Sequence, residues 1–168
     1  HDERFARWLA GFRLEVTSGL DRSIEAVAGW TPEERESCRQ WIESWPYIVR
    51  MPNLGGRPFY VLHAGVDGRK PMEDQTREHC LMARYFGGQD YLDSVHGRFW
   101  YHTLQGDRCI AFGHAPHSDP RPHPDVFALD GGAVKGGVLR ALIRSPEQPL
   151  GQLLEVPGVV HGDDEGLA

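Results

Sequence analysis

The chain lacks several features that would assign it to a class of protein at once. It has 168 residues, and none of its apolar runs approaches the roughly 20 residues that span a bilayer. Its cysteines, Cys38, Cys80 and Cys109, form no Cys-x-x-Cys pair, which argues against a zinc-finger or dithiol redox site. Free thiols are typical of a reducing compartment. We therefore expect a cytoplasmic protein that makes no contact with membranes.

Basic charge and nucleotide-binding loops are also scarce. The net charge is −6, and no Lys/Arg block is present, so nothing favours binding to a nucleic-acid backbone. The sequence has no Gly-x-Ser-x-Gly elbow, no Gly-x-x-x-x-Gly-Lys-Ser/Thr loop and no Gly-x-Gly-x-x-Gly fingerprint. Hypotheses of a serine hydrolase, a P-loop enzyme or a dinucleotide-binding fold therefore lack support. The sequence predicts no particular oligomeric state.

The bulk composition is that of one globular domain of ordinary size. Hydrophobic residues make up 40% of the chain and charged residues 25%, as in soluble proteins. The chain opens on charged residues from His1 without a methionine, so this start is no signal peptide. We expect a chain that was processed or that begins partway through a longer protein. We assign residues 1–156 to a partial domain and 157–168 to a polar tail that frays.

The first part of the sequence predicts helices. Apolar residues recur at helical spacing over residues 2–12, 20–28 and 32–45. Thr31, Pro32 and Glu34 have the pattern of a capping box at the start of the last of these. Trp41 and Trp45 lie on its apolar stripe, and at this spacing we expect core packing rather than a platform for ligand stacking.

Short apolar runs predict a sheet in the rest of the chain. Strands are expected over residues 47–51, 58–62, 108–112, 126–129 and 138–143, with an edge strand at 150–156. The first two read as a hairpin. A helix is expected over 72–86, with Leu81, Met82, Tyr85 and Phe86 facing the core. Residues 87–106 and 115–125 show no regular pattern.

Polar residues follow several of these strands directly. One run ends in His63-Ala64-Gly65, another in Gly113-His114, and a third in Asp130-Gly131-Gly132. In layered α/β sheets, chemistry gathers at the carboxyl ends of the strands. Histidine is the commonest metal ligand among side chains, so His63 and His114 are candidate ligands, although either could be a structural histidine. Asp130 is a candidate ligand or base, but an aspartate before Gly-Gly more often forms a turn.

Two other polar groups have weaker signals. His117 and His123 lie in a proline-rich loop, but their spacing matches no standard zinc pattern. Arg84 has apolar neighbours, and a guanidinium near a buried face needs an anionic partner. That partner is either a substrate phosphate or a surface carboxylate, Glu78 or Asp90.

Read in order, these short motifs resemble the C-terminal half of a calcineurin-like metallophosphoesterase. The resemblance is to the bacterial and phage branch of the Ser/Thr protein phosphatases, which includes symmetrical diadenosine tetraphosphate hydrolases. The matching segments are His1-Asp2-Glu3, His63-Ala64-Gly65, Pro71 with Glu73 and Gln75, Arg84-Tyr85-Phe86, Gly113-His114-Ala115-Pro116, Asp130-Gly131-Gly132 and Gly136-Gly137-Val138-Leu139-Arg140-Ala141-Leu142. The match covers residues 1–143.

The resemblance implies a role for each matched position. His63 and His114 would bind the second metal of a two-metal centre, His1 would protonate the leaving oxygen, and Arg84 would clamp the phosphate. The implied cofactors are two divalent ions, most often Mn²⁺, with Fe or Zn²⁺ as alternatives. Such a pair lowers the pKa of a bridging water and neutralises charge during attack on phosphorus. The implied substrates are phosphorylated proteins or nucleotides.

Some family features are absent from this sequence. The Asp-x-His and Gly-Asp-x-x-Asp-Arg-Gly motifs, which supply the first metal's ligands and another arginine, do not occur. Ala115, Gly131 and Arg140 stand where the family has threonine. The expected fold class is therefore α/β, the C-terminal half of a metallophosphoesterase β-sandwich flanked by helices. The missing half would leave an apolar face exposed.

Three functional hypotheses follow. The first is a part of a metal-dependent phosphoesterase, acting on phosphoproteins or, alternatively, on diadenosine tetraphosphate, and inactive as residues 1–168 alone. The second is a non-catalytic interaction module with a phosphatase-like fold. The third is a mononuclear zinc protein that uses His63, His114 and His117. The reading frame upstream of His1 discriminates the first two, because only an enzyme needs the absent motifs there.

Overall fold

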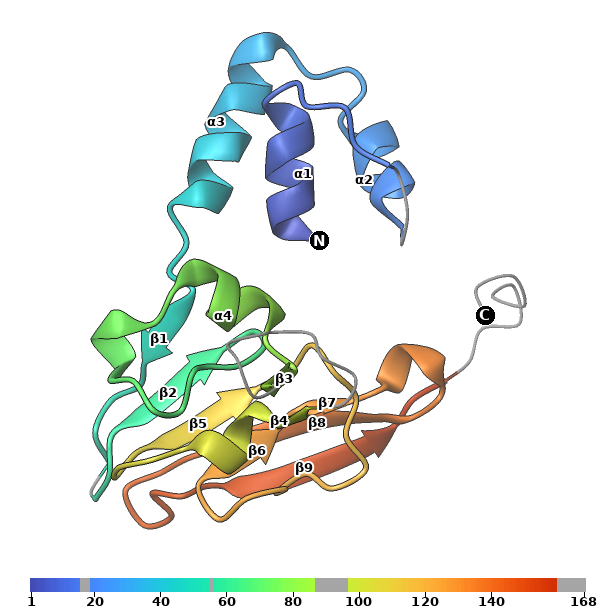
Figure 1. Ribbon diagram of the computed structural model, residues 1–168. Helices are drawn as coiled ribbons and strands as arrows, with labels where there is room; N and C mark the ends of the chain where they lie inside the picture. The colour runs from blue at the N-terminus through green and yellow to red at the C-terminus, as the bar shows by residue number, and fades with distance from the viewer. Residues whose placement is uncertain (16–18, 55, 87–96, 160–168) are drawn as a thin grey trace. The chain divides into compact units, whose positions relative to one another are not determined.

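Helices occupy the start of the chain and strands most of the remainder (Figure 1). The computed structural model describes residues 1–15, 19–54, 56–86 and 97–159. The chain divides into two compact units, His1–Pro46 and Tyr47–Ala168. None of the helices in these described ranges has the length and apolar character needed to cross a membrane. The expectations for residues 87–96 and 160–168 lie outside the described residues.

The first unit consists of helices that begin where the sequence signals predicted. They are α1 (Asp2–Leu9), α2 (Leu20–Ala26) and α3 (Pro32–Glu43). The capping box of α3 is confirmed, because the Thr31 hydroxyl accepts from the Glu34 N–H and the Glu34 carboxylate accepts from the Thr31 N–H. Gly11 adopts φ +86° just past α1, a conformation that ends a helix at little cost for glycine.

The prediction that the α3 tryptophans pack in a core is wrong. Trp41 is 61% exposed and Trp45 is 41% exposed, and of this helix only Ile42 is buried. The two indoles instead contact each other edge to face, with ring centroids 4.6 Å apart. A unit of this size cannot bury the whole apolar stripe of α3. The helix packs against α1, and both tryptophans stay exposed.

The second unit is built on a mixed sheet whose central strands are parallel. Its strands lie in the order β1 (Ile48–Arg50), β2 (Phe59–Leu62), β5 (Cys109–Phe112) and β6 (Val126–Ala128). β1 and β2 form the predicted antiparallel hairpin. β2 pairs with β5 in parallel and β5 pairs with β6 in parallel. The three runs that were predicted to end in polar residues are therefore neighbours that point the same way.

Side-chain alternation gives this sheet two apolar faces. Phe59, Cys109, Ala111 and Phe127 form a buried cluster on one face. The opposite face holds the larger cluster, which comprises Leu62, Val66, Met72, Trp100, Tyr101, Ile110, Phe112, Val126 and Ala128. Strands buried on both faces read as continuous apolar runs rather than as alternating ones, which explains their pattern in the sequence.

A second, antiparallel sheet covers the first of these faces. Its strands are β7 (Asp130–Gly131), β8 (Val138–Ile143) and β9 (Gln152–Pro157). Leu142 and Leu153 are register partners and pack against the Phe59 cluster. On the outer face of this sheet Leu139, Ile143, Leu154 and Val156 are exposed. That a missing half of the domain leaves an apolar face exposed stays a prediction.

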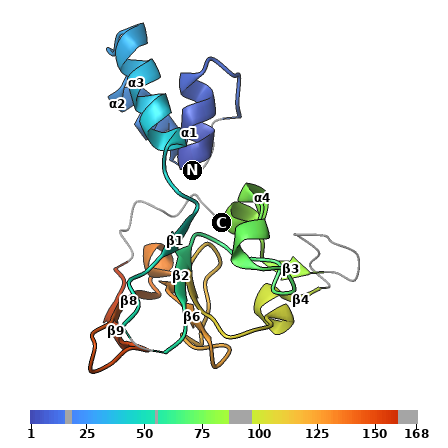
Figure 2. The same cartoon turned by 90° about the vertical axis from the view of Figure 1, so that its left-hand side faces the viewer.

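The other face of the first sheet is covered by shorter elements. They are the 3-10 turns η1 (Met72–Asp74) and η2 (Trp100–Thr103), the helix α4 (Arg77–Met82) and the two-stranded ribbon of β3 (Tyr85–Phe86) with β4 (Arg98–Phe99). Figure 2 shows β8 and β9 on one side of β2 and β6, with α4 and the ribbon on the other. The unit is thus a sandwich with a helical layer, as the predicted α/β class requires.

The single helix predicted over residues 72–86 is wrong. Gln75 is extended, and Thr76 caps a new, short helix by accepting from the His79 N–H. Ala83 is extended too and ends α4. Met82 is 51% exposed, whereas Cys80 and Ala83 are buried. The inward face of α4 is therefore rotated around the helix axis from the one that periodicity predicted, with Cys80 and Ala83 inward in place of Met82.

Replacing Thr31 by alanine should destabilise the first unit by about 1 kcal/mol, because it removes the side chain that caps α3. Urea unfolding followed by circular dichroism measures the change. Ser37→Ala, on the exposed side of the same helix, is the matched control. Equal stability of the two variants would contradict the capping role.

Replacing Gly137 by alanine should destabilise the second unit by about 1–3 kcal/mol through overpacking. A Cβ at Gly137 would overlap the backbone carbonyl oxygens of Gly131 and Gly132, which close the connection between β7 and β8. Gly29→Ala is the control, since a Cβ there meets no heavy atom within 4 Å. Thermal unfolding of the two variants compares them, and an unchanged Gly137→Ala midpoint would refute the close approach.

Candidate functional site

Two histidines meet at the carboxyl end of the parallel strands. His63 follows β2, and His114 follows β5 after Gly113. Nε2 of His63 lies 3.0 Å from Nδ1 of His114, with the ring centroids 4.8 Å apart and the planes at 61°. The strand ends are joined as well, because the Gly113 N–H donates to the His63 carbonyl at 2.8 Å. The structure thus brings together the two residues that the sequence predicted as metal ligands.

The backbone at His114 is strained. Its φ is +70°, the only positive φ of a non-glycine residue in the described part of the chain. The Ala115 N–H donates to the Gly113 carbonyl at 2.8 Å, so His114 is the centre of a γ-turn, a rare form with positive φ. A conformation of this kind costs of order 1–3 kcal/mol and is found where the surroundings enforce it, often at functional sites.

Asp130 lies at the same edge of the sheet, but its carboxylate is hydrogen-bonded to the main chain. Its Oδ1 accepts from the Gly132 N–H at 2.9 Å, which is the turn-forming role expected from the sequence. Its Cβ is 3.9 Å from the place that a Cβ on Gly113 would occupy. The third strand end therefore reaches the same edge of the sheet, with its carboxylate engaged in the turn.

The loop after His63 is tightly packed against α4 and η2. The Ala64 N–H donates to the Cys80 carbonyl at 2.7 Å. A Cβ on Gly65 would come within 2.5 Å of the Trp100 indole, so only glycine fits there. Burial raises the pKa of the Cys80 thiol to about 11, which keeps it protonated and unreactive at neutral pH. This packing fixes where the chain leaves His63.

Asp67 is a buried carboxylate in the same loop. Its oxygens accept from the Arg69 side chain at 2.8 and 2.9 Å, and Lys70 Nζ lies 3.9 Å away. The hydrogen bond from Arg69 holds the pKa of Asp67 below its ordinary value. The side chain of Gln75 bridges the loop by accepting from the Asp67 N–H and donating to the Asp67 carbonyl, both at 2.8 Å.

Arg84 follows α4 by two residues and is exposed. Its carbonyl accepts from the Trp100 N–H at 3.1 Å, which anchors its backbone to the layer over the sheet. The described residues show no ion pair from Arg84 to Glu78, and Asp90 lies outside them. Its guanidinium is therefore available at the surface, but the structure shows no contact with the histidine pair.

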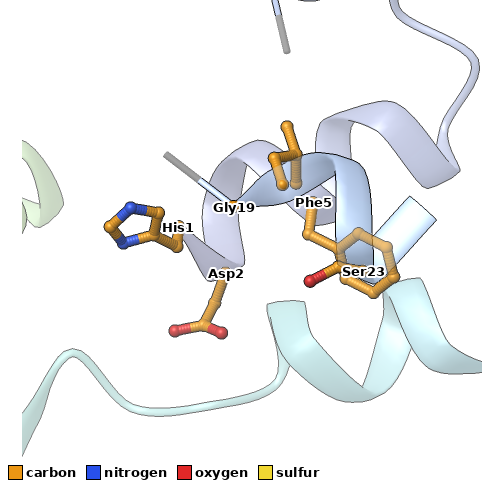
Figure 3. A pocket seen from close by; sticks show the side chains of 6 residues that line it. His1, Asp2, Phe5, Gly19 and Ser23 are labelled. Carbon is orange, nitrogen blue, oxygen red and sulfur yellow. The ribbon is translucent and has the colours of Figure 1, made fainter. Parts of the chain in front are cut away.

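His1 belongs to the first unit, where it precedes α1. It lines an open cavity of about 280 Å³ together with Asp2, Phe5, Gly19, Leu20 and Ser23 (Figure 3). Every lining residue comes from the helical unit. The role of His1 as a proton donor therefore stays a prediction from sequence.

His117 is part of an aromatic cluster and not of the histidine pair. Its ring lies against Phe99, Tyr101 and Phe112, with centroids 4.8, 5.8 and 5.4 Å away. Burial, with a smaller effect of Arg140, lowers its pKa. In the described ranges no three His, Cys, Asp or Glu side chains are grouped closely enough to hold a metal. The structure therefore gives no support to a zinc site of His63, His114 and His117, nor to one at His117 and His123.

Sequence reasoning missed the importance of Arg140. Its residue surface is only 7% exposed, and its guanidinium donates to Glu155 and to the carbonyls of His117 and Ser118. A signal was present, since Arg140 occupies an inward position of an alternating strand, where a charge is unexpected. The sequence could not name its partners, which are backbone carbonyls far along the chain.

The geometry of the pair suits a cation. At metal–nitrogen bonds of about 2.1 Å, two nitrogens separated by roughly 3 Å subtend about 90°, the angle between neighbouring ligands in octahedral coordination. The same separation is that of a hydrogen bond between the rings, with the proton position set by the tautomer. Of the two imidazoles, that of His63 is exposed and that of His114 is half-buried.

Known proteins similar to this chain include bacterial proteins named asymmetrical bis(5'-nucleosyl)-tetraphosphatase PrpE. The chain is 27% identical to the one from Geobacillus thermodenitrificans over 150 residues, 88% of this chain and 61% of that protein. It is 28% identical to the one from Anoxybacillus flavithermus over 153 residues, with the same coverage. The chain thus spans about three fifths of the length of these relatives. No family model matches it.

The fold is similar to that of a solved structure described as "Crystal structure of a putative diadenosine tetraphosphatase". The TM-score is 0.66 at 21% sequence identity, and the match covers 95% of this chain and 66% of the other. At this level of identity the similarity concerns the fold. The predicted fold class, an α/β arrangement of sheets flanked by helices like that of a metallophosphoesterase, is confirmed.

Proposed function

We propose that this chain supplies part of the active site of a metal-dependent phosphohydrolase that cleaves dinucleoside polyphosphates. The observation that carries the proposal is the convergence of His63 and His114, 3.0 Å apart at the carboxyl ends of parallel strands. The strained backbone at His114 supports it, because strain of this kind marks positions held for a purpose other than stability.

The names of the relatives favour a nucleotide substrate over a phosphoprotein. They are tetraphosphatases described as asymmetrical, so the alternative substrate considered from the sequence is better supported than the phosphoprotein. Asymmetrical cleavage of diadenosine tetraphosphate would give ATP and AMP, whereas the symmetrical cleavage that the sequence resemblance offered as the alternative function would give two ADP. We adopt the asymmetrical reaction. A cytoplasmic location is part of the same proposal.

Each candidate residue has a chemical task in this proposal. His63 and His114 would hold one divalent ion, Mn²⁺ in the first instance with Fe or Zn²⁺ as alternatives, through one ring nitrogen each. When bound, two such ions activate a water molecule and neutralise charge on the phosphoryl group. Arg84 would bind a phosphate oxygen, since an exposed guanidinium offers a planar pair of donors. His1 would donate the proton to the leaving oxygen, the role of a general acid.

Loss of either histidine should weaken metal binding. In residues 1–168, His63→Ala and His114→Ala should each lower the affinity for Mn²⁺ by at least about tenfold, as changes around metal sites commonly do. The measurement is the signal of free Mn²⁺ in electron paramagnetic resonance. His123→Ala is the control, because among the described residues His123 Nδ1 accepts a local bond from the Asp125 N–H and lies outside the histidine pair. Wild-type affinity in both variants would refute the proposed ligands.

Residues 1–168 alone should show negligible hydrolysis of p-nitrophenyl phosphate with excess Mn²⁺, because two imidazoles hold at most one ion. The product of the complete reading frame in which this chain lies should convert diadenosine tetraphosphate to ATP and AMP, and His114→Ala should reduce that activity to background. Chromatography of the nucleotides measures it. Robust turnover by residues 1–168 that is lost in His63→Ala, or a preference for phosphopeptides in the complete protein, would overturn the assignment.

A further inference from the structure

Arg140 is a buried cation between the two sheets of the second unit. It lies on the inward face of β8 opposite Glu155 of β9, and its side chain is 3% exposed. Its Nε donates to Glu155 Oε1 at 2.7 Å, but that carboxylate is 45% exposed. A buried charge requires more compensation than one half-exposed partner provides. The rest comes from backbone carbonyls.

Those carbonyls belong to the loop that starts at His114 and to the end of β6. Nη1 donates to the His117 carbonyl at 2.7 Å and to the Ala128 carbonyl at 3.2 Å. Nη2 donates to the Ser118 carbonyl at 2.9 Å. The planar fork of the guanidinium thus joins consecutive carbonyls of the loop to a strand of the parallel sheet, a geometry that lysine cannot reproduce.

Two backbone hydrogen bonds fix the same loop. The His117 N–H donates to the Asp130 carbonyl, and the Ala128 N–H donates to the Pro120 carbonyl, both at 2.9 Å. Between these anchors and the end of β5 lies the γ-turn at His114. Because that turn is unfavourable by itself, its shape depends on the anchoring of the residues that follow it.

We propose that Arg140 is a positioning residue for the site: by holding the carbonyls of His117 and Ser118 it keeps the His114 ring against His63. The expected effect on metal binding rests on the proposed function. The positioning of His114 by Arg140 rests on the contacts described above. Arg140 touches no substrate and acts only through the loop. It stands where the resembling family has threonine, so the family motif does not assign it this task.

The test compares Arg140→Lys with Arg144→Lys in residues 1–168. Arg144 lies just beyond the same strand, donates to the Pro149 carbonyl and packs over the Phe59 ring, but it makes no contact with the His114 loop in the described contacts. Free Mn²⁺ measured by electron paramagnetic resonance gives the affinity. Amide hydrogen exchange at Ala115 and His117 and the ring nitrogen resonances of His63 and His114, recorded without metal, give the loop geometry.

We expect Arg140→Lys to lose about 10–100-fold in Mn²⁺ affinity, the usual effect of removing a group that orients a ligand. Exchange at Ala115 and His117 should accelerate at least tenfold, and the ring resonances of both histidines should shift. Arg144→Lys should keep wild-type values throughout. Unchanged affinity and exchange in Arg140→Lys, or equal losses in Arg144→Lys, would overturn the proposal.

The metal-free measurements separate this proposal from the proposed function. If the wild-type chain binds no Mn²⁺, the proposed function is refuted. Amide hydrogen exchange and the histidine ring resonances, both recorded without metal, then still decide whether Arg140 positions His114. If Arg140→Lys does not fold, Arg140→Gln takes its place, because it removes the buried charge and keeps amide donors for one carbonyl. Wild-type exchange at His117 in that variant would likewise overturn the proposal.

Discussion

The parallel pairing of β2, β5 and β6 is the constraint on which the candidate site depends. Tyr60 lies beside Ile110, and Ile110 lies beside Val126, so the strands run and end together. Whatever residue follows each strand must therefore emerge at the same edge of the sheet. Both faces of these strands are buried, which makes their register costly to change, since a slip by one residue would exchange the two apolar faces.

A rigid sheet does not by itself bring two imidazoles to 3.0 Å. His63 follows β2 without a positive φ, whereas the chain after β5 turns sharply at His114 with φ +70°. The strain, of order 1–3 kcal/mol, is compensated by contacts downstream of the turn rather than at it. Arg140 and the Asp130 carbonyl hold the residues that follow. The second sheet thus shapes a site that lies at the end of the first.

The sequence predicted local features well where one short-range rule decided the outcome. The capping box at Thr31 and the apolar strands are such cases, and so is the turn at Asp130. The single helix predicted over 72–86 does not form, because a tertiary contact outweighs the helical preference of this segment. Gln75 is buried and bridges the loop of Asp67, which holds its backbone extended and lets Thr76 start a new helix. Nothing in the periodicity of that segment reports such a contact.

The candidate site was predictable only in part, for the same reason. Strand ends could be read from the sequence, so His63 and His114 could be named. Their separation could not be, because it depends on a γ-turn, and γ-turns leave no marker in a Gly-His-Ala sequence. Arg140 is the clearest case, because its inward position breaks the apolar alternation of β8 and marks it as unusual. Its partners could not be predicted, because they include main-chain carbonyls, which every residue has whatever its type.

Charge sets a final condition on any function that involves phosphates. The chain carries a net charge of −6, so a polyanionic substrate gains nothing from the overall field and must be attracted locally. Near the loops of the site, Arg69 and Lys70 are engaged with Asp67, and Arg140 is buried. The two imidazoles are neutral when they act as ligands. Under the proposed function, that local attraction would come from bound cations and from an exposed group such as Arg84.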